Sequence, residues 1–240
     1  MSKLSSVVAT APSVGAVAES SGAKSRIVLV DDHPVVREGL QLRLEAEPDL
    51  EIVGLAADTH EAMVRVRQLK PDLVITDLSL GGKPGLELVK DLDKAFPDIP
   101  VLVLSIHDET LWAERVLRAG AGGYIMKSQA TQKVVDAVRH VLAGGIWISE
   151  KMNSLLLQKM ARTGGRKAPP TGSSLESLTD REIEVYQMIG QGMAARHIAA
   201  KLHLSVKTIE VHREHIKEKL GLRSGMELVR HAVTHALEDI

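Results

Sequence analysis

Residues 26–56 have the sequence RIVLVDDHPVVREGLQLRLEAEPDLEIVGLA, in which two apolar runs flank a stretch with helical spacing. The runs Ile27–Val30 and Ile52–Ala56 are short and rich in aliphatic and β-branched residues, as buried strands are. Between them, the apolar positions of Val35–Glu47 repeat at the spacing of a helix. This order of strand, helix and strand predicts one unit of a parallel sheet.

The same alternation continues to residue 143 and predicts five strand–helix units. The further strand-like runs are Leu73–Thr76, Val101–Ser105 and Gly123–Met126. The further helical stretches are Thr59–Leu69, Leu86–Ala95, Leu111–Ala119 and Gln132–Ala143. Because right-handed crossovers place helices on both faces of such a sheet, we expect a doubly wound α/β fold with five parallel strands. A strand order of 2-1-3-4-5 would make the first and third strands neighbours.

A second and smaller unit begins at residue 175 and has no strand pattern. Apolar positions repeat at helical spacing through Asp180–Ile189, Ala194–Leu202, Val206–Leu220 and Gly225–Leu237. Capping signals mark the ends of these stretches, namely Thr179 with Glu182, Ser224 with Glu227, Ser205, Gly192 and Gly221. We therefore expect a small all-α domain of four helices.

The chain divides into four segments. We expect a disordered N-terminal extension at 1–25, the α/β domain at 26–147, a linker at 148–174 and the helical domain at 175–240. The extension lacks a periodic apolar pattern. The linker begins with a helical stretch and continues as TGGRKAPPTGSS, whose Gly, Pro and Ser content predicts flexibility.

The composition is that of a globular protein. Hydrophobic residues make up 44% of the 240 residues and charged residues 25%. No apolar run approaches the roughly 18 residues that cross a bilayer, and the interrupted stretch from Val7 to Ala18 does not fit a signal peptide. The absence of cysteine excludes disulfides, thiolate catalysis and Cys-based zinc sites. We expect a cytoplasmic protein with no membrane partner.

Charge is distributed unevenly among the segments. Residues 27–150 hold 13 Lys and Arg against 20 Asp and Glu, whereas residues 151–174 hold five basic and no acidic residues. The helical domain at 175–240 holds nine basic and ten acidic residues. It therefore lacks the surplus of positive charge that is typical of DNA-binding domains.

Polar residues stand where the predicted strands end. Asp31 and Asp32 follow the first strand, Asp77 follows the third, Ser105 ends the fourth and Lys127 follows the fifth. Because the carboxyl ends of parallel strands meet at one edge of a sheet, we expect these side chains to converge. Neighbouring carboxylates repel each other, and a hard divalent cation such as Mg²⁺ relieves that repulsion.

Asp77 is the strongest candidate for a nucleophile that accepts a phosphoryl group. It stands alone at the end of the central strand, whereas Asp31 and Asp32 form an adjacent pair suited to the metal. The backbone carbonyl of Ser79 would add a metal ligand. Lys127 would place a cation on the phosphoryl oxygens, and the Ser105 hydroxyl would donate a hydrogen bond to one of them after transfer.

Four strings, LVDDHPVVREGL, LVITDLSLGGKPGLELV, VLVLSIHDE and AGAGGYIMK, resemble the receiver domain of NarL/FixJ-type response regulators. The resemblance implies that Asp77 is the phosphoacceptor, Asp31 and Asp32 the acidic metal ligands, Ser105 the switch hydroxyl, Lys127 the conserved lysine and Tyr124 the coupled aromatic residue. The chain departs from the family at Leu80-Gly81, where relatives have Met-Pro. A glycine at this position loosens the loop.

Residues 178–232 resemble the LuxR-type output domain along their whole length. The resemblance implies a helix-turn-helix in which Val206–Leu220 enters the major groove of DNA. The implied DNA contacts are Lys207, Thr208, Glu210, Val211, Glu214 and Lys217, while Ile209, Arg213, Ile216 and Leu220 face the core. Relatives carry Lys at the positions of Glu210 and Glu214. A Glu can accept from a cytosine amine, but it loses attraction to phosphate.

The last helix carries a second implied interface. Met226, Val229, Val233 and Leu237 recur along it at helical spacing. In the family, the outer face of this helix pairs two output domains. Part of the stripe must also close the core of its own small domain.

The joint pattern predicts a transcriptional response regulator of a two-component system, and not an enzyme. We expect the unphosphorylated receiver to cover the recognition helix, and phosphorylation of Asp77 to release the helix-turn-helix domain, which then dimerises and binds promoter DNA. The expected partners are double-stranded promoter DNA, a cognate sensor histidine kinase, RNA polymerase and, on phosphorylation, a second copy of the chain.

Two alternatives belong to other functional classes. The first is an enzyme, namely an Asp-nucleophile phosphatase or phosphotransferase on a similar α/β sheet. Enzymes of the haloacid dehalogenase type have a second Asp two residues after the nucleophile. This chain has Ser79 at that position, which disfavours the enzyme. The second is a phosphorylation-dependent protein-interaction module whose output domain does not bind DNA. Only the near-neutral charge of residues 175–240 favours it.

Overall fold

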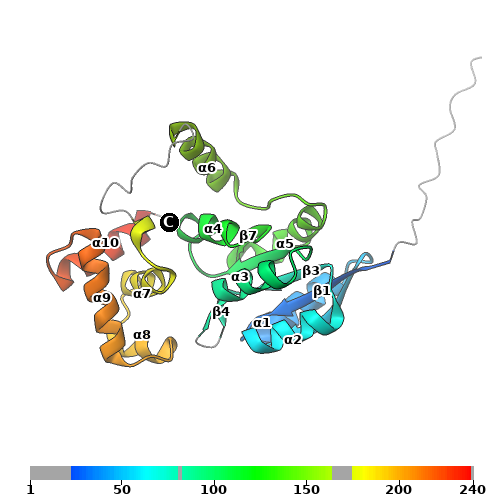
Figure 1. The fold of residues 1–240 in the computed structure, drawn as a ribbon, viewed down its shortest axis with the longest axis horizontal. Helices are drawn as coiled ribbons and strands as arrows, with labels where there is room; N and C mark the ends of the chain where they lie inside the picture. Colours follow the sequence, from blue (N-terminus) through cyan, green and yellow to red (C-terminus); the bar gives the residue numbers. More distant parts are fainter. Residues whose placement is uncertain (1–22, 81–82, 164–174, 239–240) are drawn as a thin grey trace, which may run out of the picture.

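The computed structural model describes residues 23–80, 83–163 and 175–238, which form two domains connected through a helix (Figure 1). The first domain contains β1 (Ser25–Val30), α1 (Pro34–Glu45), β2 (Leu50–Ala56), α2 (Thr59–Leu69), β3 (Leu73–Thr76), β4 (Ser79–Leu80), β5 (Lys83–Pro84), α3 (Gly85–Ala95), β6 (Val101–Ser105), α4 (Glu109–Arg118), β7 (Gly123–Met126) and α5 (Lys127–Leu142). After α6 (Glu150–Thr163), the second domain contains η1 (Leu175–Ser177), α7 (Asp180–Gly190), α8 (Ala195–Lys201), α9 (Val206–Leu220) and α10 (Gly225–Glu238).

The main sheet has the order β2-β1-β3-β6-β7, and all of its paired strands are parallel. This confirms the expected fold class and strand order, since β6 and β7 are the fourth and fifth strands of the main sheet. β1 begins at Ser25, whose N–H donates to the carbonyl of Asp49 at 2.8 Å. The strand therefore takes in the last residue of the segment 1–25 that we predicted to be disordered. Residues 1–22 of that segment lie outside the described residues.

Two apolar layers cover the two faces of the sheet, because successive side chains of a strand point to opposite faces. Ile27 and Leu29 belong to a buried cluster that includes side chains of α1 and α5. Val28 and Val30 belong to a second cluster, which includes side chains of α2, α3 and α4. The sheet is thus covered on both sides, as a doubly wound fold requires.

The helical domain follows its predicted capping signals, with one exception. Thr179 and Glu182 form a complete capping box at the start of α7, and the Ser205 hydroxyl accepts from the N–H of Thr208 at 3.0 Å at the start of α9. At the start of α10, Ser224 accepts from the N–H of Glu227, but the Glu227 carboxylate binds the N–H of Arg223. The second predicted box is therefore only half formed.

The largest differences from the sequence expectation concern α5, a short hairpin and a single helical turn. Helix α5 begins at Lys127 and not at Gln132, because its first turn is polar apart from the buried Ala130 and gives no apolar period. The short hairpin of β4 and β5 and the single turn η1 are too brief to produce a pattern. The hairpin matters for the site, because it begins two residues after Asp77.

Apolar contact joins the two domains. Buried side chains of the receiver, among them Trp112 of α4, and of the helical domain, among them Leu178, belong to one continuous cluster. Helix α6 also ties the parts together, because the Lys159 ammonium lies 2.8 Å from the Glu114 carboxylate on α4 and 2.6 Å from that of Glu176 in η1. Among the helices described, none is both long and apolar enough to span a membrane.

Gly85 offers a test of how tightly the fold holds the loop after β3. A Cβ at Gly85 would lie 2.4 Å from the carbonyl oxygen of Asp77 and 2.6 Å from the Cα of Leu78, both backbone atoms that can yield only if the loop shifts. We expect Gly85→Ala to lower the stability of the chain by about 1–3 kcal/mol through this overlap.

Gly39 is the matched control, since it lies inside α1 and a Cβ at that position would extend into open space. Gly39→Ala should stabilise the chain by about 1 kcal/mol, because alanine is the better helix former. Thermal melting followed by circular dichroism compares the two variants. A midpoint for Gly85→Ala equal to or above that of the unsubstituted chain would contradict the prediction.

Candidate functional site

Three carboxylates meet at the carboxyl edge of the sheet. Asp31 directly follows β1 and Asp77 directly follows β3, and their exposed fractions are only 3% and 2%. Together with Asp32 and His33, they place one ligand atom each within 4.8 Å of one another. The structure therefore brings together the three aspartates predicted as metal ligands, and it adds the His33 ring.

Lys127 closes this acidic cluster from α5. Its ammonium lies 2.5 Å from Oδ2 of Asp31 and 2.7 Å from Oδ2 of Asp77. Burial raises the pKa of Asp77, and the Lys127 charge offsets part of that effect. Burial alone would lower the pKa of Lys127, but the charges of Asp77 and Asp31 outweigh it and raise that pKa. Lys127 therefore stays positively charged and neutralises part of the cluster.

One oxygen of Asp77 fits a further cation. Oδ1 of Asp77 is buried and has no hydrogen-bond partner within the part of the chain that the structure describes. Buried polar atoms are normally satisfied, so such an oxygen indicates a missing ligand. The Asp77 carboxylate to which it belongs is part of a cluster of carboxylates, whose oxygens are the ligands that Mg²⁺ prefers. The residues present thus suit a hard divalent cation.

Ser105 and Tyr124 both form hydrogen bonds with His107. The buried Ser105 hydroxyl accepts from the N–H of His107 at 3.2 Å. The Tyr124 hydroxyl donates to the His107 carbonyl at 2.6 Å, and burial raises the pKa of this hydroxyl, so that it keeps its proton. The Ser79 hydroxyl faces Nε2 of His107 at 3.0 Å. The side chains of Ser79, Ser105 and Tyr124 therefore share one neighbour.

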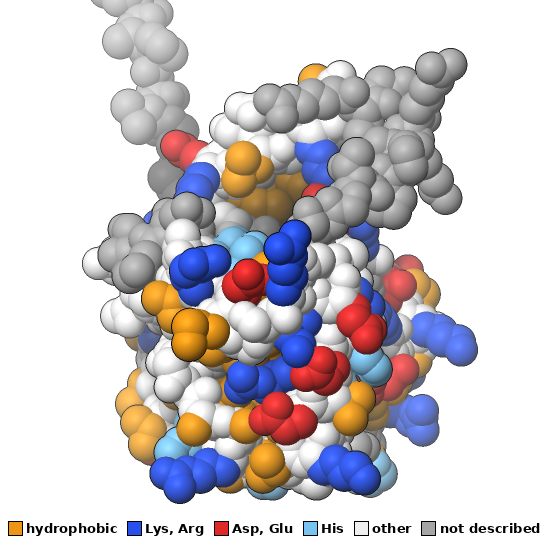
Figure 2. Space-filling model, turned by 90° about the vertical axis from the view of Figure 1, so that its left-hand side faces the viewer, with side chains coloured by type: hydrophobic (Ala, Val, Ile, Leu, Met, Phe, Trp, Pro, Cys, Tyr) orange, Lys and Arg blue, Asp and Glu red, His pale blue; other side chains and the backbone are white. Residues whose placement is uncertain are grey.

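The predicted DNA-binding face of α9 is largely open. Lys207, Glu210, Val211 and Glu214 are exposed, Thr208 and Lys217 are partly exposed, and the core positions Ile209, Ile216 and Leu220 are buried. Figure 2 shows the side of the molecule where the helical domain lies, with basic and acidic side chains interspersed on it. No single-sign patch dominates this view.

Both acidic residues on this face pair with a basic neighbour three residues later. The Glu214 carboxylate lies 2.7 Å from the Lys217 ammonium, and the Glu210 carboxylate lies 3.5 Å from Nε of Arg213. Lys217 is thus a partly buried, ion-paired cation. Its role as a phosphate contact requires that Glu214 release it.

The expectation that the receiver covers the recognition helix is wrong for this arrangement of the domains. The receiver contacts α7 and η1, while α9 lies on the outer side of the helical domain (Figure 1). Helix α4 finds its polar and apolar partners in η1, in the turn after it and on α7, so these elements dock on the receiver. The outer face of α9 is charged and offers no such apolar surface. Separation of the domains would therefore free α7 and not α9.

Sequence reasoning did not single out His33 or His107. Both stand in the strings quoted for the resemblance, His33 directly after the Asp pair and His107 two residues after Ser105. Their nearness in sequence to predicted site residues could have indicated that these two histidines belong to the site. The partner of His107 in the other domain, Gln187, gave no signal, because 80 residues separate the two.

Comparison with known proteins assigns both domains. Residues 27–139 match the family model of the response regulator receiver domain, and residues 176–232 match that of the bacterial regulatory proteins of the luxR family. Oxygen regulatory protein NreC of Staphylococcus carnosus (strain TM300) is 39% identical over 215 residues, which cover 89% of this chain and 99% of that protein. NreC of Staphylococcus aureus (strain MRSA252) is 36% identical over 213 residues, covering 88% and 98%.

Solved structures agree on the fold. A two-component response regulator of the LuxR family from Aurantimonas sp. SI85-9A1 is 33% identical, with a TM-score of 0.54, over 58% of this chain and 99% of that chain. The RcsB response regulator of Salmonella typhimurium has a TM-score of 0.62 at 24% identity, over 89% and 98% of the two chains. The second likeness concerns the fold alone.

These matches decide between the functional classes considered above, since the relatives form a family of transcriptional regulators and not of enzymes. The chain has a receiver with a buried aspartate cluster and a LuxR-type helical domain, and its relatives match over nearly their whole length. It therefore belongs to the NarL/FixJ-type response regulators, the DNA-binding transcriptional regulators of two-component systems.

Proposed function

We propose that Asp77 is the residue that accepts the phosphoryl group, with Asp31, Asp32, Asp77 and the backbone carbonyl of Ser79 holding Mg²⁺. The observation that carries this proposal is the buried Oδ1 of Asp77, which has no hydrogen-bond partner among the described residues although the Asp77 carboxylate belongs to the acidic cluster. When bound, Mg²⁺ would neutralise carboxylate and phosphoryl charge.

The chain's own residues then supply positioning and charge. The Asp77 carboxylate forms a bond to phosphorus as the bond from phosphorus to the donor breaks, which yields an acyl phosphate. Lys127 already contacts Asp77 and is held in its charged form, so that its ammonium can follow the new negative charge to the phosphoryl oxygens. We propose that Ser105 donates to one of these oxygens and that Tyr124 responds to its movement.

For the output domain, we propose that α9 enters the major groove through the face formed by Lys207, Thr208, Glu210, Val211, Glu214 and Lys217. The exposure of this face supports the proposal. One solved structure with this fold is of RcsB from Salmonella enterica serovar Typhimurium, bound to promoter rprA in the presence of the phosphomimetic BeF3-. A balanced rather than basic face implies that base contacts contribute more here than attraction to phosphate.

A second copy of the chain is the partner that we propose for α10. Met226 is 83% exposed and Val229 is also exposed, while Leu228 and Ala232 on the other side of the helix are buried in the domain core. An exposed apolar pair beside the DNA-binding helix suits pairing of two output domains. The side chain of Leu237, the last residue of the predicted stripe, lies outside the described residues.

The remaining proposed partners are a sensor histidine kinase, which donates the phosphoryl group, and RNA polymerase at the promoter. We propose the cytoplasm as the place of action, because promoter DNA is the target.

The phosphoacceptor is tested by replacing Asp77. Asp77→Asn should abolish incorporation of phosphate from acetyl phosphate, because an amide is not a nucleophile toward phosphorus. Asp72→Asn is the control, since Asp72 is an exposed carboxylate just before β3 that accepts from the backbone of Arg26. Hydroxylamine-labile phosphate is measured on both. Its persistence on the Asp77 variant would refute the assignment.

The cation site is tested through Lys127. Lys127→Met removes the ammonium from between Asp31 and Asp77, and the loss of one partner of such a buried ion pair costs about 3 kcal/mol. Because Mg²⁺ would replace the lost charge, MgCl2 should raise the thermal midpoint of Lys127→Met more than that of the unsubstituted chain. Lys133→Met on the same helix, which removes only a contact to Gln129, should respond to MgCl2 as the unsubstituted chain does. Equal shifts for all three chains would argue against a cation at this cluster.

The ion pair on α9 predicts how DNA binding depends on salt. Glu214→Ala should release Lys217 toward phosphate, raise affinity for all sequences and steepen the log–log salt slope by about 0.9. Glu218→Ala, which removes an exposed carboxylate one turn further along, is the control and should change the slope less. Fluorescence anisotropy over a salt series measures both variants. An unchanged slope for Glu214→Ala would mean that Lys217 does not reach the DNA backbone.

A further inference from the structure

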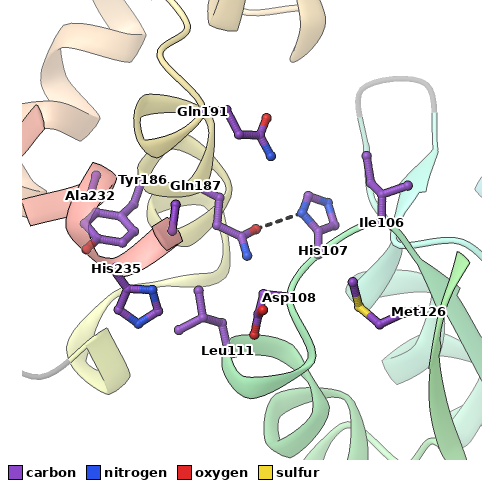
Figure 3. Close-up of a pocket in the computed structure, with 11 residues that line it drawn as sticks. Ile106, His107, Asp108, Leu111, Met126, Tyr186, Gln187, Gln191, Ala232 and His235 are labelled. Atoms are coloured by element: carbon purple, nitrogen blue, oxygen red, sulfur yellow. Dashed lines mark hydrogen bonds between the residues drawn. The ribbon is translucent and has the colours of Figure 1, made fainter. Parts of the chain in front are cut away.

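His107 lies between the two domains and contacts both (Figure 3). It follows Ser105 by two residues, and only 6% of its surface is exposed. On the receiver side its backbone binds Ser105 and Tyr124, and its ring binds Ser79. On the other side, Nδ1 lies 2.7 Å from Oε1 of Gln187 on α7. One side chain therefore touches the surroundings of the phosphorylation site and the output domain.

The positions of the protons in this network follow from Trp112. Its indole N–H can only donate, and it lies 2.9 Å from the same Oε1 of Gln187. Oε1 is therefore an acceptor, and Nδ1 of His107 carries the proton that it donates to Gln187. In a neutral ring, which the burial of His107 favours, Nε2 then carries no proton and accepts from the Ser79 hydroxyl at 3.0 Å. The network runs from Ser79 through the His107 ring to Gln187.

The surroundings of His107 keep its ring neutral. Burial lowers the pKa of His107 to about 4, although the hydrogen bond to Gln187 opposes that effect. The ring thus carries a single N–H group, which donates its hydrogen bond to Gln187 of the output domain. A ring that moved would leave Trp112 as the one donor to Oε1 of the partly buried Gln187 in this network.

We propose that His107 couples the phosphorylation of Asp77 to the release of the output domain, through its hydrogen bond to Gln187. This inference rests on the proposed function of Asp77. When the Ser105 hydroxyl turns to the phosphoryl group, the His107 N–H loses its acceptor. Movement of Tyr124 takes away the donor to the His107 carbonyl. The loop from β6 to α4 then loses the two bonds that hold His107 against Gln187.

Arg115 holds the same interface without contact to the phosphorylation site. Its guanidinium donates to the carbonyl of Leu178 at 2.8 Å and pairs with Asp180 at 3.0 Å. It also donates to the carbonyls of Leu175 and Glu176. Arg115 therefore contributes to the stability of the interface, whereas His107 makes that stability depend on the phosphorylation of Asp77. The two roles are separable by mutation.

The test compares DNA affinity with and without acetyl phosphate and Mg²⁺ in the full chain. Gln187→Met keeps the side chain length but removes the acceptor for His107 and Trp112. Because the outer face of α9 is already exposed before release, release acts on DNA affinity by freeing the output domain to pair with a second copy through α10. We therefore expect Gln187→Met to show higher DNA affinity without phosphate and an activation ratio near one, compared with an activation of at least about 5-fold in the unsubstituted chain, the lower end of typical couplings. Gln191→Met, at the C-cap of α7 and lining the same cavity, is the control and should keep the activation ratio.

A variant at Arg115 separates coupling from simple adhesion. Arg115→Lys and Arg115→Ala weaken the interface, and the one whose affinity without phosphate best matches that of Gln187→Met is compared with it. At equal basal affinity, the Arg115 variant should still respond to acetyl phosphate, whereas Gln187→Met should not. Equal responses of the two would overturn the coupling role of His107.

A fluorescence readout does not depend on DNA. The chain has two tryptophans, so Trp147→Phe leaves Trp112, which is 1% exposed at the interface, as the single reporter. Acetyl phosphate with Mg²⁺ should shift its emission to the red in the Trp147→Phe chain, and should produce a smaller shift when Gln187→Met is added. A red shift of the same size in both chains would contradict the inference.

Phosphate incorporation is measured on the same samples, so that the two proposals fail in different ways. Normal incorporation together with full activation of Gln187→Met overturns the role of His107 alone. No incorporation into the unsubstituted chain overturns the assignment of Asp77, and the coupling that rests on it.

Discussion

The ammonium of Lys127 between Asp31 and Asp77 is the interaction on which the site depends. The two carboxylates end neighbouring strands, so the parallel pairing of β1 and β3 forces them together whatever their charge. Burial makes their repulsion stronger, because the interior screens charge less than water does. One cation balances only part of the negative charge of Asp31, Asp32 and Asp77. The edge of the receiver sheet therefore keeps an excess of negative charge, which a further cation would balance.

This excess of negative charge could be predicted from the sequence, because the positions of the carboxylates depend on backbone geometry alone. The strand runs determined which residues stand at carboxyl ends, and the strand order made Asp31 and Asp77 neighbours. The start of α5 was predicted too late, because Lys127 begins a polar first turn whose partners lie in the sheet. The bond from His107 to Gln187 could not be predicted, since it joins two domains across a stretch that has no pattern to fix their arrangement. By contrast, the pair Glu214–Lys217 has helical spacing and was within reach of sequence reasoning.

The charge balance of the output domain has a similar local explanation. Glu210 and Glu214 would be unfavourable on a helix that faces phosphates, but each pairs with a basic residue one turn later on α9. Such pairs add only roughly 0.3–0.5 kcal/mol of stability in water, but each one balances the charge of a carboxylate on the face that would meet DNA. The near-neutral net charge of this domain is therefore compatible with DNA binding. It shifts the expected recognition from attraction to phosphate toward contacts with base edges.

The position of the output domain constrains how the receiver can be phosphorylated. A pocket beside the acidic cluster is lined by Asp32, His33 and Ser79 from the receiver and by Arg181, Lys201 and His203 from α7, α8 and the turn after α8. The helical domain therefore lies at the mouth of the acidic cluster, whose phosphorylation we propose as the trigger for its release. The two equilibria are linked thermodynamically. If phosphorylation favours separation of the domains by a given factor, separation favours phosphorylation by the same factor. If Asp77 accepts the phosphoryl group, as we propose, a donor as large as a kinase domain would need the helical domain to move aside, whereas a donor as small as acetyl phosphate would not. The closed arrangement thus acts on access to Asp77 as well as on the freedom of the output domain, and both effects come from one interface.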